Sequence, residues 1–96
     1  MTDGYRTIYR YSLDVEDVQA INVPSIFKPL HVGHVGGRLF LWAEVEFLDF
    51  PDAVACRRLI NIYGTGNPRT GKDKVYIGTV QMPCGLVWHV YDGGFA

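Results

Sequence analysis

The clearest fold signal in this chain is the stretch LHVGHVGGRLFLWAEVE, residues 30–46. Two runs rich in β-forming residues, Leu30–Val35 and Arg38–Glu46, flank the pair Gly36-Gly37. Two-residue hairpin turns of the primed types need positive φ at their central positions, and glycine adopts positive φ without a steric cost. The stretch therefore predicts a β-hairpin with its turn at Gly36-Gly37.

The second arm of this hairpin is apolar on both of its faces. Leu39 and Leu41 alternate with Phe40 and Trp42, and the arm turns polar only at its end. A strand with two apolar faces is typical of a central position in a covered sheet. Because a small monomer cannot easily cover both faces, we predict that Phe40 and Trp42 form an interface in a homodimer or higher oligomer.

Alternation of polar and apolar residues with a period of two continues through most of the chain, as in strands with one buried face. Including the hairpin, we expect seven strands, at Tyr5–Val15, Gln19–Val23, Leu30–Val35, Arg38–Glu46, Arg57–Tyr63, Val75–Gln81 and Leu86–Tyr91. This pattern predicts one all-β domain over residues 1–96. Its architecture would be a small antiparallel sandwich or barrel of about six or seven strands with at most one short helix.

Three further segments are predicted to be irregular. Ser25–Pro29 is bracketed by prolines, which interrupt sheet hydrogen bonding. Phe47–Ala55 is a predicted loop, with room for one helical turn after Asp52 as its N-cap. Residues 92–96 form a glycine-containing end that we expect to be a flexible tail.

Length and composition exclude several classes of protein. The chain has 96 residues, enough for one small domain, and 48% of them are hydrophobic, which excludes a disordered chain. A net charge of −1 excludes a broadly basic nucleic-acid or membrane-binding surface. Two cysteines are too few for a disulfide scaffold, and the longest apolar run, Leu39–Ala43, is far too short for a membrane helix. We therefore expect a soluble protein of a reducing cytoplasm.

A glycine-rich basic segment, GNPRTGKD at residues 66–73, partly matches a phosphate-binding loop. A triphosphatase loop opens a helix, whereas the residues that follow here, Val75–Val80, are β-forming. The segment could still hold an anion without catalysis. We predict that Arg69, Lys72 and Lys74 bind phosphate groups.

The same ligand would need aromatic side chains to stack on its base. Tyr63 precedes the basic segment, and Trp88 and His89 lie in the last predicted strand. We therefore predict a site for an anionic, nucleotide-like ligand that combines these three residues with the basic segment.

Catalytic and metal-binding patterns are incomplete. His31 and His34 are three residues apart, so on a strand they point to opposite faces. Cys84 lies near His89 without a group to orient the imidazole. A pair of glutamates, Glu44 and Glu46, is typical of a solvated strand face. We therefore predict a protein that is not an enzyme and that binds no metal and no cofactor.

Nucleic-acid binding is an alternative. Aromatic and basic residues alternate in Tyr5-Arg6 and in Tyr9-Arg10-Tyr11, and Arg57-Arg58 precedes Tyr63. Stacking combined with positive charge is the recipe for binding single strands. A small phosphodiesterase or nuclease is a second alternative, and a component of a larger assembly is a third.

Several segments in order resemble a group of small proteins, of unassigned function, encoded by bacteriophages and prophages. They are IYRY at residues 8–11, LWA at 41–43, YGTGNP at 63–68, YIGTVQ at 76–81 and LVWHVY at 86–91. The resemblance covers nearly the whole chain, and it departs from the group's pattern in Glu44–Ala55 and after Pro68.

This resemblance implies a genomic context and carries over no catalytic residue. Small phage accessory proteins often act by stoichiometric binding. They block a host protein or sequester a signalling nucleotide. Together with the motifs, the resemblance leads us to expect a non-catalytic binding protein. It would antagonise a host bacterial defence by trapping a nucleotide-like ligand or masking a host protein.

Overall fold

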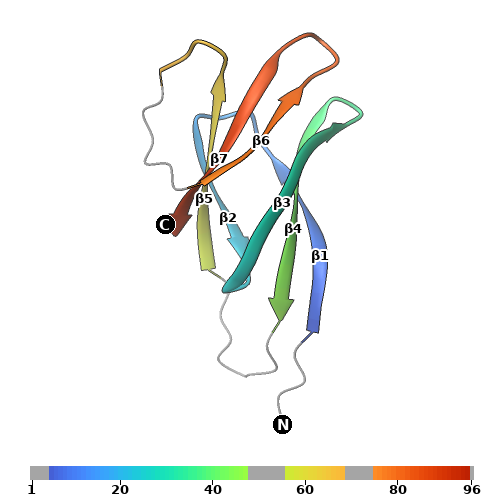
Figure 1. Ribbon diagram of the computed structural model, residues 1–96, viewed down its shortest axis with the longest axis vertical. Coiled ribbons are helices and arrows are strands. Elements are labelled where there is room, and N and C mark those ends of the chain that lie inside the picture. The colour runs from blue at the N-terminus through green and yellow to red at the C-terminus, as the bar shows by residue number, and fades with distance from the viewer. Residues whose placement is uncertain (1–4, 48–55, 69–74, 96) are drawn as a thin grey trace.

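The structure is a computed structural model that describes residues 5–47, 56–68 and 75–95, and its fold is all-β (Figure 1). Two antiparallel sheets form a sandwich: sheet A has the strand order β1-β4-β3, and sheet B has the order β2-β5-β7-β6. The described strands are β1 (Tyr5–Leu13), β2 (Val18–Val23), β3 (Ile26–Val35), β4 (Arg38–Phe47), β5 (Cys56–Gly64), β6 (Val75–Gln81) and β7 (Val87–Phe95). The prediction of a small antiparallel all-β domain is confirmed.

The predicted hairpin joins β3 and β4. Gly36 and Gly37 have φ angles of 58° and 82°, as a primed two-residue turn requires. Strand β4 is the central strand of sheet A, paired with β1 on one side and β3 on the other. Leu39 and Leu41 of β4 are buried in the interior, which confirms the prediction of a central strand.

The interior is an apolar layer to which both sheets contribute. Its buried members are Leu13, Val32, Leu39, Leu41, Ile60, Ile62, Val80, Met82 and Val90. On one side of the sandwich the sheets meet directly, where β3 packs against β6. A Cβ atom at Gly78 of β6 would lie 2.8 Å from Cγ2 of Val32, so this close contact requires a glycine.

Two strands extend well beyond their predicted bounds, and the other differences are of one or two residues. Strand β3 begins at Ile26 and passes through Pro29, where the register with β4 shifts. A proline is tolerated there because β3 is an edge strand and the shift marks an irregularity. Strand β7 continues to Phe95, so residues 92–95 are its last residues rather than a flexible tail. The helical turn expected after Asp52 lies outside the described residues.

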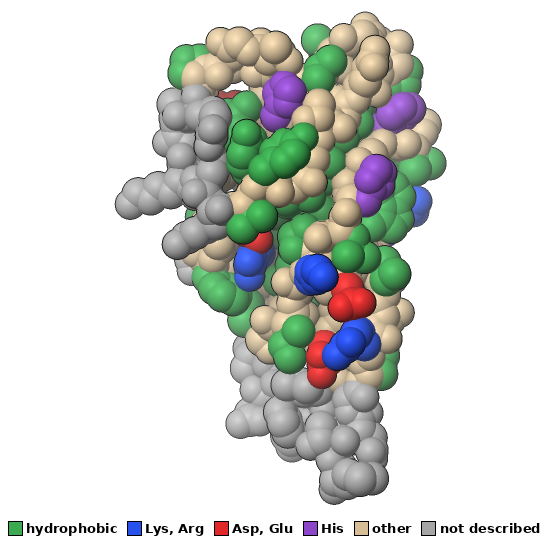
Figure 2. Space-filling model, viewed as in Figure 1, with side chains coloured by type: hydrophobic (Ala, Val, Ile, Leu, Met, Phe, Trp, Pro, Cys, Tyr) green, Lys and Arg blue, Asp and Glu red, His purple; other side chains and the backbone are tan. Residues whose placement is uncertain are grey.

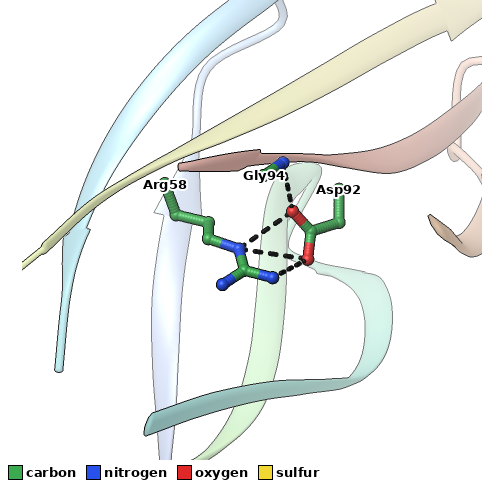
Figure 3. Close-up of polar contacts among 3 residues, drawn as sticks. All are labelled: Arg58, Asp92 and Gly94. Atoms are coloured by element: carbon green, nitrogen blue, oxygen red, sulfur yellow. Dashed lines mark hydrogen bonds and ion pairs between the residues drawn. The ribbon is translucent and has the colours of Figure 1, made fainter. Parts of the chain in front are cut away.

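Near its end, strand β7 carries Asp92, whose buried carboxylate is paired with Arg58 of β5 (Figure 3). The Asp92 carboxylate accepts hydrogen bonds from Nε of Arg58 at 3.0 Å and from its terminal nitrogen at 2.7 Å. The backbone N–H of Gly94 donates a further bond to Asp92, at 2.8 Å. The guanidinium carbon of Arg58 lies 5.5 Å from the ring centre of Phe27, a residue of sheet A. A charge pair therefore replaces apolar packing at this end of the interior.

Candidate ligand-binding site

The candidate site lies on the outer face of sheet B, where β5 and β7 run side by side (Figure 1). Tyr63 is directly opposite His89 in this pairing. Their neighbours in sequence, Ile62 and Val90, face the interior, so Tyr63 and His89 face outward. Tyr63 is nevertheless only 5% exposed, which shows that its outer face is covered.

A cavity of about 260 Å³ opens on this face. Its walls come from β5, the turn that follows β5, and β7. The turn is closed by a hydrogen bond of 3.1 Å from the backbone N–H of Asn67 to the carbonyl oxygen of Gly64. The lining residues are Tyr63, Gly64, Thr65, Gly66, Asn67, His89 and Tyr91.

Tyrosine rings give the site one rigid apolar side. The rings of Tyr63 and Tyr91 meet edge to face, with centres 5.8 Å apart and planes at 70°. Tyr76 of β6 packs on the far side of Tyr91 in the same way, at 5.3 Å. Such perpendicular contacts are favourable for aromatic pairs and fix the orientation of each ring.

The imidazole of His89 is held through both of its nitrogens. Nε2 lies 2.8 Å from the hydroxyl of Thr65, and Nδ1 lies 3.0 Å from the hydroxyl of Thr79. The Thr79 hydroxyl also contacts the phenol oxygen of Tyr76 at 2.5 Å. A neutral imidazole donates through one nitrogen and accepts through the other, so one threonine must donate to the ring and the other must accept.

This hydrogen-bonded chain places a polar group at the cavity. When Thr79 donates to Nδ1, Nε2–H donates to Thr65, and the Thr65 hydroxyl can then donate to a ligand. These hydrogen bonds end at Tyr76, which is exposed. The opposite direction of donation therefore also leaves each group with a partner, because the Tyr76 hydroxyl can bond to water. The cavity therefore combines a fixed aromatic wall with the hydroxyl of Thr65.

None of the seven lining residues is a carboxylate or a thiol. Cys84, considered above as a partner of His89, is exposed in the turn between β6 and β7, and both nitrogens of His89 are bonded to threonines. In residues 5–47, 56–68 and 75–95, no three His, Cys, Asp or Glu side chains are grouped so that they could hold a metal ion. The arrangement fits the binding of a planar group with hydrogen-bond acceptors.

The structure brings together two of the predicted site residues and separates a third. Tyr63 and His89 line one cavity. Trp88 packs against the apolar interior, on the face of β7 opposite His89. Trp88 therefore does not line this cavity, since neighbouring residues of a strand point to opposite faces. The predicted phosphate-binding residues Arg69, Lys72 and Lys74 lie outside the described residues.

Three residues of the site were missed by the sequence analysis. Tyr91 could have been found by alternation, because it lies two residues after His89 on the same strand face. Thr65 belongs to the turn after β5, and the approach of Thr79 to His89 depends on the pairing of β6 with β7. No local pattern in the sequence indicates that pairing.

The outer face of sheet A is a different kind of surface. The rings of Phe40 and Trp42 have centres 6.1 Å apart, and neither side chain is fully exposed. The guanidinium carbon of Arg10 lies 4.2 Å from the ring centre of Phe40, and the His31 ring lies 5.7 Å from Trp42. Two neighbouring side chains thus partly cover the surface predicted to be an oligomer interface.

The segments considered for nucleic-acid binding do not form one surface. Arg58 is bonded to Asp92 in the interior, and Tyr63 faces outward from sheet B. On β1 the tyrosines and arginines alternate, and Arg6 is paired with Glu46 at 3.5 Å. Figure 2 shows positive and negative side chains intermixed on the face it displays, over the lower part of β3 and β4.

These features define a small β-sandwich domain with a polar and aromatic cavity on the outer face of one sheet. The chain belongs to the family Domain of unknown function (DUF7352), whose model matches residues 5–94. No curated protein and no solved structure matches the chain. In the part of the chain that the structure describes, no helix has the length and apolar character needed to cross a membrane.

Proposed function

We propose that this domain is a non-catalytic binding protein that holds a nucleotide-like anionic ligand in the cavity of sheet B. The observation that carries the proposal is the geometry around His89. Its two ring nitrogens are fixed by Thr65 and Thr79 beside a wall of perpendicular tyrosines. A preformed pocket of this kind costs little ordering when a flat ligand enters.

The size of the cavity fits one ring system. Sites for drug-sized ligands are about 300–1,000 Å³, and this cavity is about 260 Å³. A purine or pyrimidine base can place its ring against Tyr63 or Tyr91 and its acceptor atoms near the Thr65 hydroxyl. Arg69, Lys72 and Lys74 follow the lining residue Asn67 in the sequence. They stay in the proposal as the residues for the phosphate groups.

Binding without turnover is the form of the proposal that the lining residues support. A hydroxyl hydrogen-bonded to an imidazole acts as a nucleophile in enzymes whose imidazole is oriented by a third group, commonly a carboxylate. None of the seven residues that line this cavity is a carboxylate, and both nitrogens of His89 contact threonine hydroxyls instead. We therefore propose that the site recognises a ligand and does not transform it.

The biological role follows from the resemblance to phage-encoded proteins. In this proposal the domain acts in the host cytoplasm and removes a nucleotide-like signal from a bacterial defence pathway by stoichiometric binding. Masking of a host protein is the other form of antagonism, and it predicts no small-molecule ligand.

Calorimetric titration with adenosine and guanosine monophosphates and their cyclic forms tests the proposal. At least one nucleotide is expected to bind, with no product detected by chromatography. His89→Gln removes one of the two ring contacts and is expected to weaken binding at least about tenfold, or 1.4 kcal/mol. The matched control is His31→Gln, because His31 also lies beside an aromatic ring but on the outer face of sheet A.

Three outcomes would overturn the proposal. The first is the absence of binding by every nucleotide up to millimolar concentration, which would favour masking of a host protein. The second is hydrolysis of a nucleotide, which would make the protein an enzyme. The third is an equal loss of binding in His31→Gln and His89→Gln, which would place the site elsewhere.

A further inference from the structure

We infer that β1 is a dimerisation edge, where β1 of a second copy of this chain pairs antiparallel and joins two copies of sheet A into one six-stranded sheet. This inference is independent of the proposed ligand. It begins from the four edge strands of the sandwich, which are β1 and β3 in sheet A and β2 and β6 in sheet B. An edge strand exposes backbone N–H and C=O groups that can pair with another chain, and proteins usually protect such edges.

Three of the four edges carry a protective feature. Strand β3 contains Pro29 and a register shift, and it packs against β6. Strand β6 has its own register shift between Tyr76 and Gly78, in addition to its contact with β3. Strand β2 has only six residues. Bulges, prolines, short length and coverage by another element are the usual ways to block pairing at an edge.

Strand β1 has none of these features, and its edge carries only the charges of Arg6 and Arg10 as protection. It pairs with β4 in an unbroken register from Tyr5 to Leu13, with no proline, glycine or shift. Figure 1 shows β1 at the outer side of the molecule, with no described strand beyond it. Its side chains are also exposed, since Tyr5 and Ile8 are each 57% accessible and Tyr9 is 42% accessible.

One register pairs β1 with itself over its full length and without a contact between like charges. A two-fold axis perpendicular to the sheet keeps the inner faces of both copies on the same side. With that axis at Tyr9, Arg10 of each copy lies opposite Ile8 of the other, and Arg6 lies opposite Ser12 of the other. On the inner face, Tyr9 of one copy lies opposite Tyr9 of the other.

The neighbouring symmetric registers are disfavoured by charge. An axis at Ile8 places Arg6 directly opposite Arg10 of the second copy, twice in each dimer. An axis at Arg10 places the two Arg10 side chains opposite each other. Like charges directly opposite across two strands are destabilising. Axes at Thr7 or Tyr11 avoid these contacts but pair only residues 5–9 or 9–13 of each strand, whereas the axis at Tyr9 pairs all 9 residues. Charge and strand length together favour a second copy, paired at Tyr9, as the occupant of this edge.

This interface differs from the one predicted from sequence, in which Phe40 and Trp42 are the contact residues. Arg10 and His31 already lie on these two rings. In the β1-paired dimer the outer faces of both copies stay accessible and form one continuous surface.

Sedimentation equilibrium of single variants tests both the edge and the register. Ile8→Arg places arginine opposite Arg10 of the second copy and is expected to weaken dimerisation at least tenfold. Within one copy residue 8 lies opposite Glu44, so arginine at this position adds an attractive charge pair and does not destabilise the isolated monomer. Ile8→Glu also removes the isoleucine, but it places glutamate opposite Arg10 of the second copy. Within one copy this glutamate lies opposite Glu44, so circular dichroism at the assay temperature first checks that the variant is folded. The folded variant is expected to dimerise at least as tightly as the natural chain.

The matched control is Ile26→Arg. Ile26 is 45% exposed, lies on the same outer face and pairs with Glu46 of β4, but it belongs to β3, the opposite edge of sheet A. It is expected to leave dimerisation unchanged. A dimer stacked through Phe40 and Trp42 would instead respond equally to arginine at both positions, and that result would overturn the inference. A natural chain that is monomeric at submillimolar concentration, or equal effects of arginine and glutamate at Ile8, would also overturn it.

Discussion

The two sheets use similar side chains on their outer faces and produce different surfaces. On sheet A, Phe40 and Trp42 lie under the side chains of Arg10 and His31, and the result is a filled surface. On sheet B, His89 lies beside the ring of Tyr63 and is held at both nitrogens by threonines, and the result is a cavity. The comparison teaches that aromatic residues and histidine do not by themselves make a site. On sheet B, the hydrogen bonds from Thr65 and Thr79 fix the imidazole of His89 beside the cavity.

The two sheets also differ in where they place their ion pairs. The Arg58–Asp92 pair of sheet B lies inside, with the Asp92 side chain only 2% exposed. The Arg6–Glu46 pair of sheet A lies outside, and the Arg6 side chain is 65% exposed. A pair removed from water becomes expensive to break, because the charge that stays behind has lost both its hydration and its partner.

The largest predicted effect comes from breaking the buried pair. Asp92→Asn removes the charge but keeps the size of the side chain, and it leaves the half-buried guanidinium of Arg58 without a counter-charge. We expect a loss of about 3 kcal/mol in the free energy of unfolding. That loss is a large share of the roughly 5–15 kcal/mol that stabilises a typical domain. Urea unfolding followed by tryptophan fluorescence measures the change.

The matched control is Glu46→Gln, which breaks the exposed pair of sheet A by the same chemical change. We expect it to cost less than about 1 kcal/mol, since exposed pairs contribute little. Equal losses in Asp92→Asn and Glu46→Gln would contradict the assignment of different roles to the two pairs.

An intermediate effect is expected where the two sheets meet. Gly78→Ala adds a Cβ atom 2.8 Å from Cγ2 of Val32, a buried and branched side chain with little freedom to move. Overpacking of this kind typically costs about 1–3 kcal/mol. The expected result is a lower midpoint of thermal unfolding, measured by circular dichroism.

Gly33→Ala is the control within sheet A. Its added Cβ atom would lie 3.1 Å from Nε2 of His31, the end of an exposed side chain that can turn away. Neither Gly33 nor Gly78 has positive φ, so backbone strain does not separate the two variants. If Gly33→Ala destabilised the protein as much as Gly78→Ala, close packing of β3 on β6 would not be the cause.

The prediction from sequence succeeded where the signal is local. The hairpin at Gly36-Gly37 and the central position of β4 depend on turn chemistry and on alternation, and both were predicted. Tyr63 and His89 were predicted to belong to one site, and the structure places both at one cavity. Trp88 does not line it, because its aromatic character was given more weight in the prediction than its parity along β7.

The failures concern residues whose partners are distant in sequence. Asp92 was placed in a flexible tail because a carboxylate between tyrosine and glycine gives no sign of burial. Its burial depends on Arg58, which is 34 positions away. Ser25–Pro29 was predicted to be irregular, whereas Ile26–Pro29 belongs to β3. The tolerance of Pro29 in β3 depends on an edge position that only the sheet order defines. Such non-local pairings cannot be derived from the pattern of one segment.

The smallest predicted effect concerns the tyrosines on the inner face of sheet A at alkaline pH. Burial, and to a lesser degree the nearby phenol of Tyr9, raises the pKa of Tyr11 above its ordinary value of 10.0. The folded state therefore favours the neutral phenol of Tyr11 more than the unfolded chain does. The resulting stabilisation is complete below pH 10 and is lost as the pH rises through the raised pKa of the folded state.

Tyr11→Phe removes this titration and keeps the ring that packs edge to face on Phe27. We expect the variant and the natural chain to lose different amounts of stability between about pH 8 and about pH 11, the natural chain losing more. Urea unfolding at the two pH values measures both losses, and their difference isolates Tyr11 from the other groups that titrate in this range. Identical losses would show that the phenol of Tyr11 is as well hydrated in the folded state as in the unfolded chain. The partial cover that sheet B gives to the inner face of β1 would then not extend to this side chain.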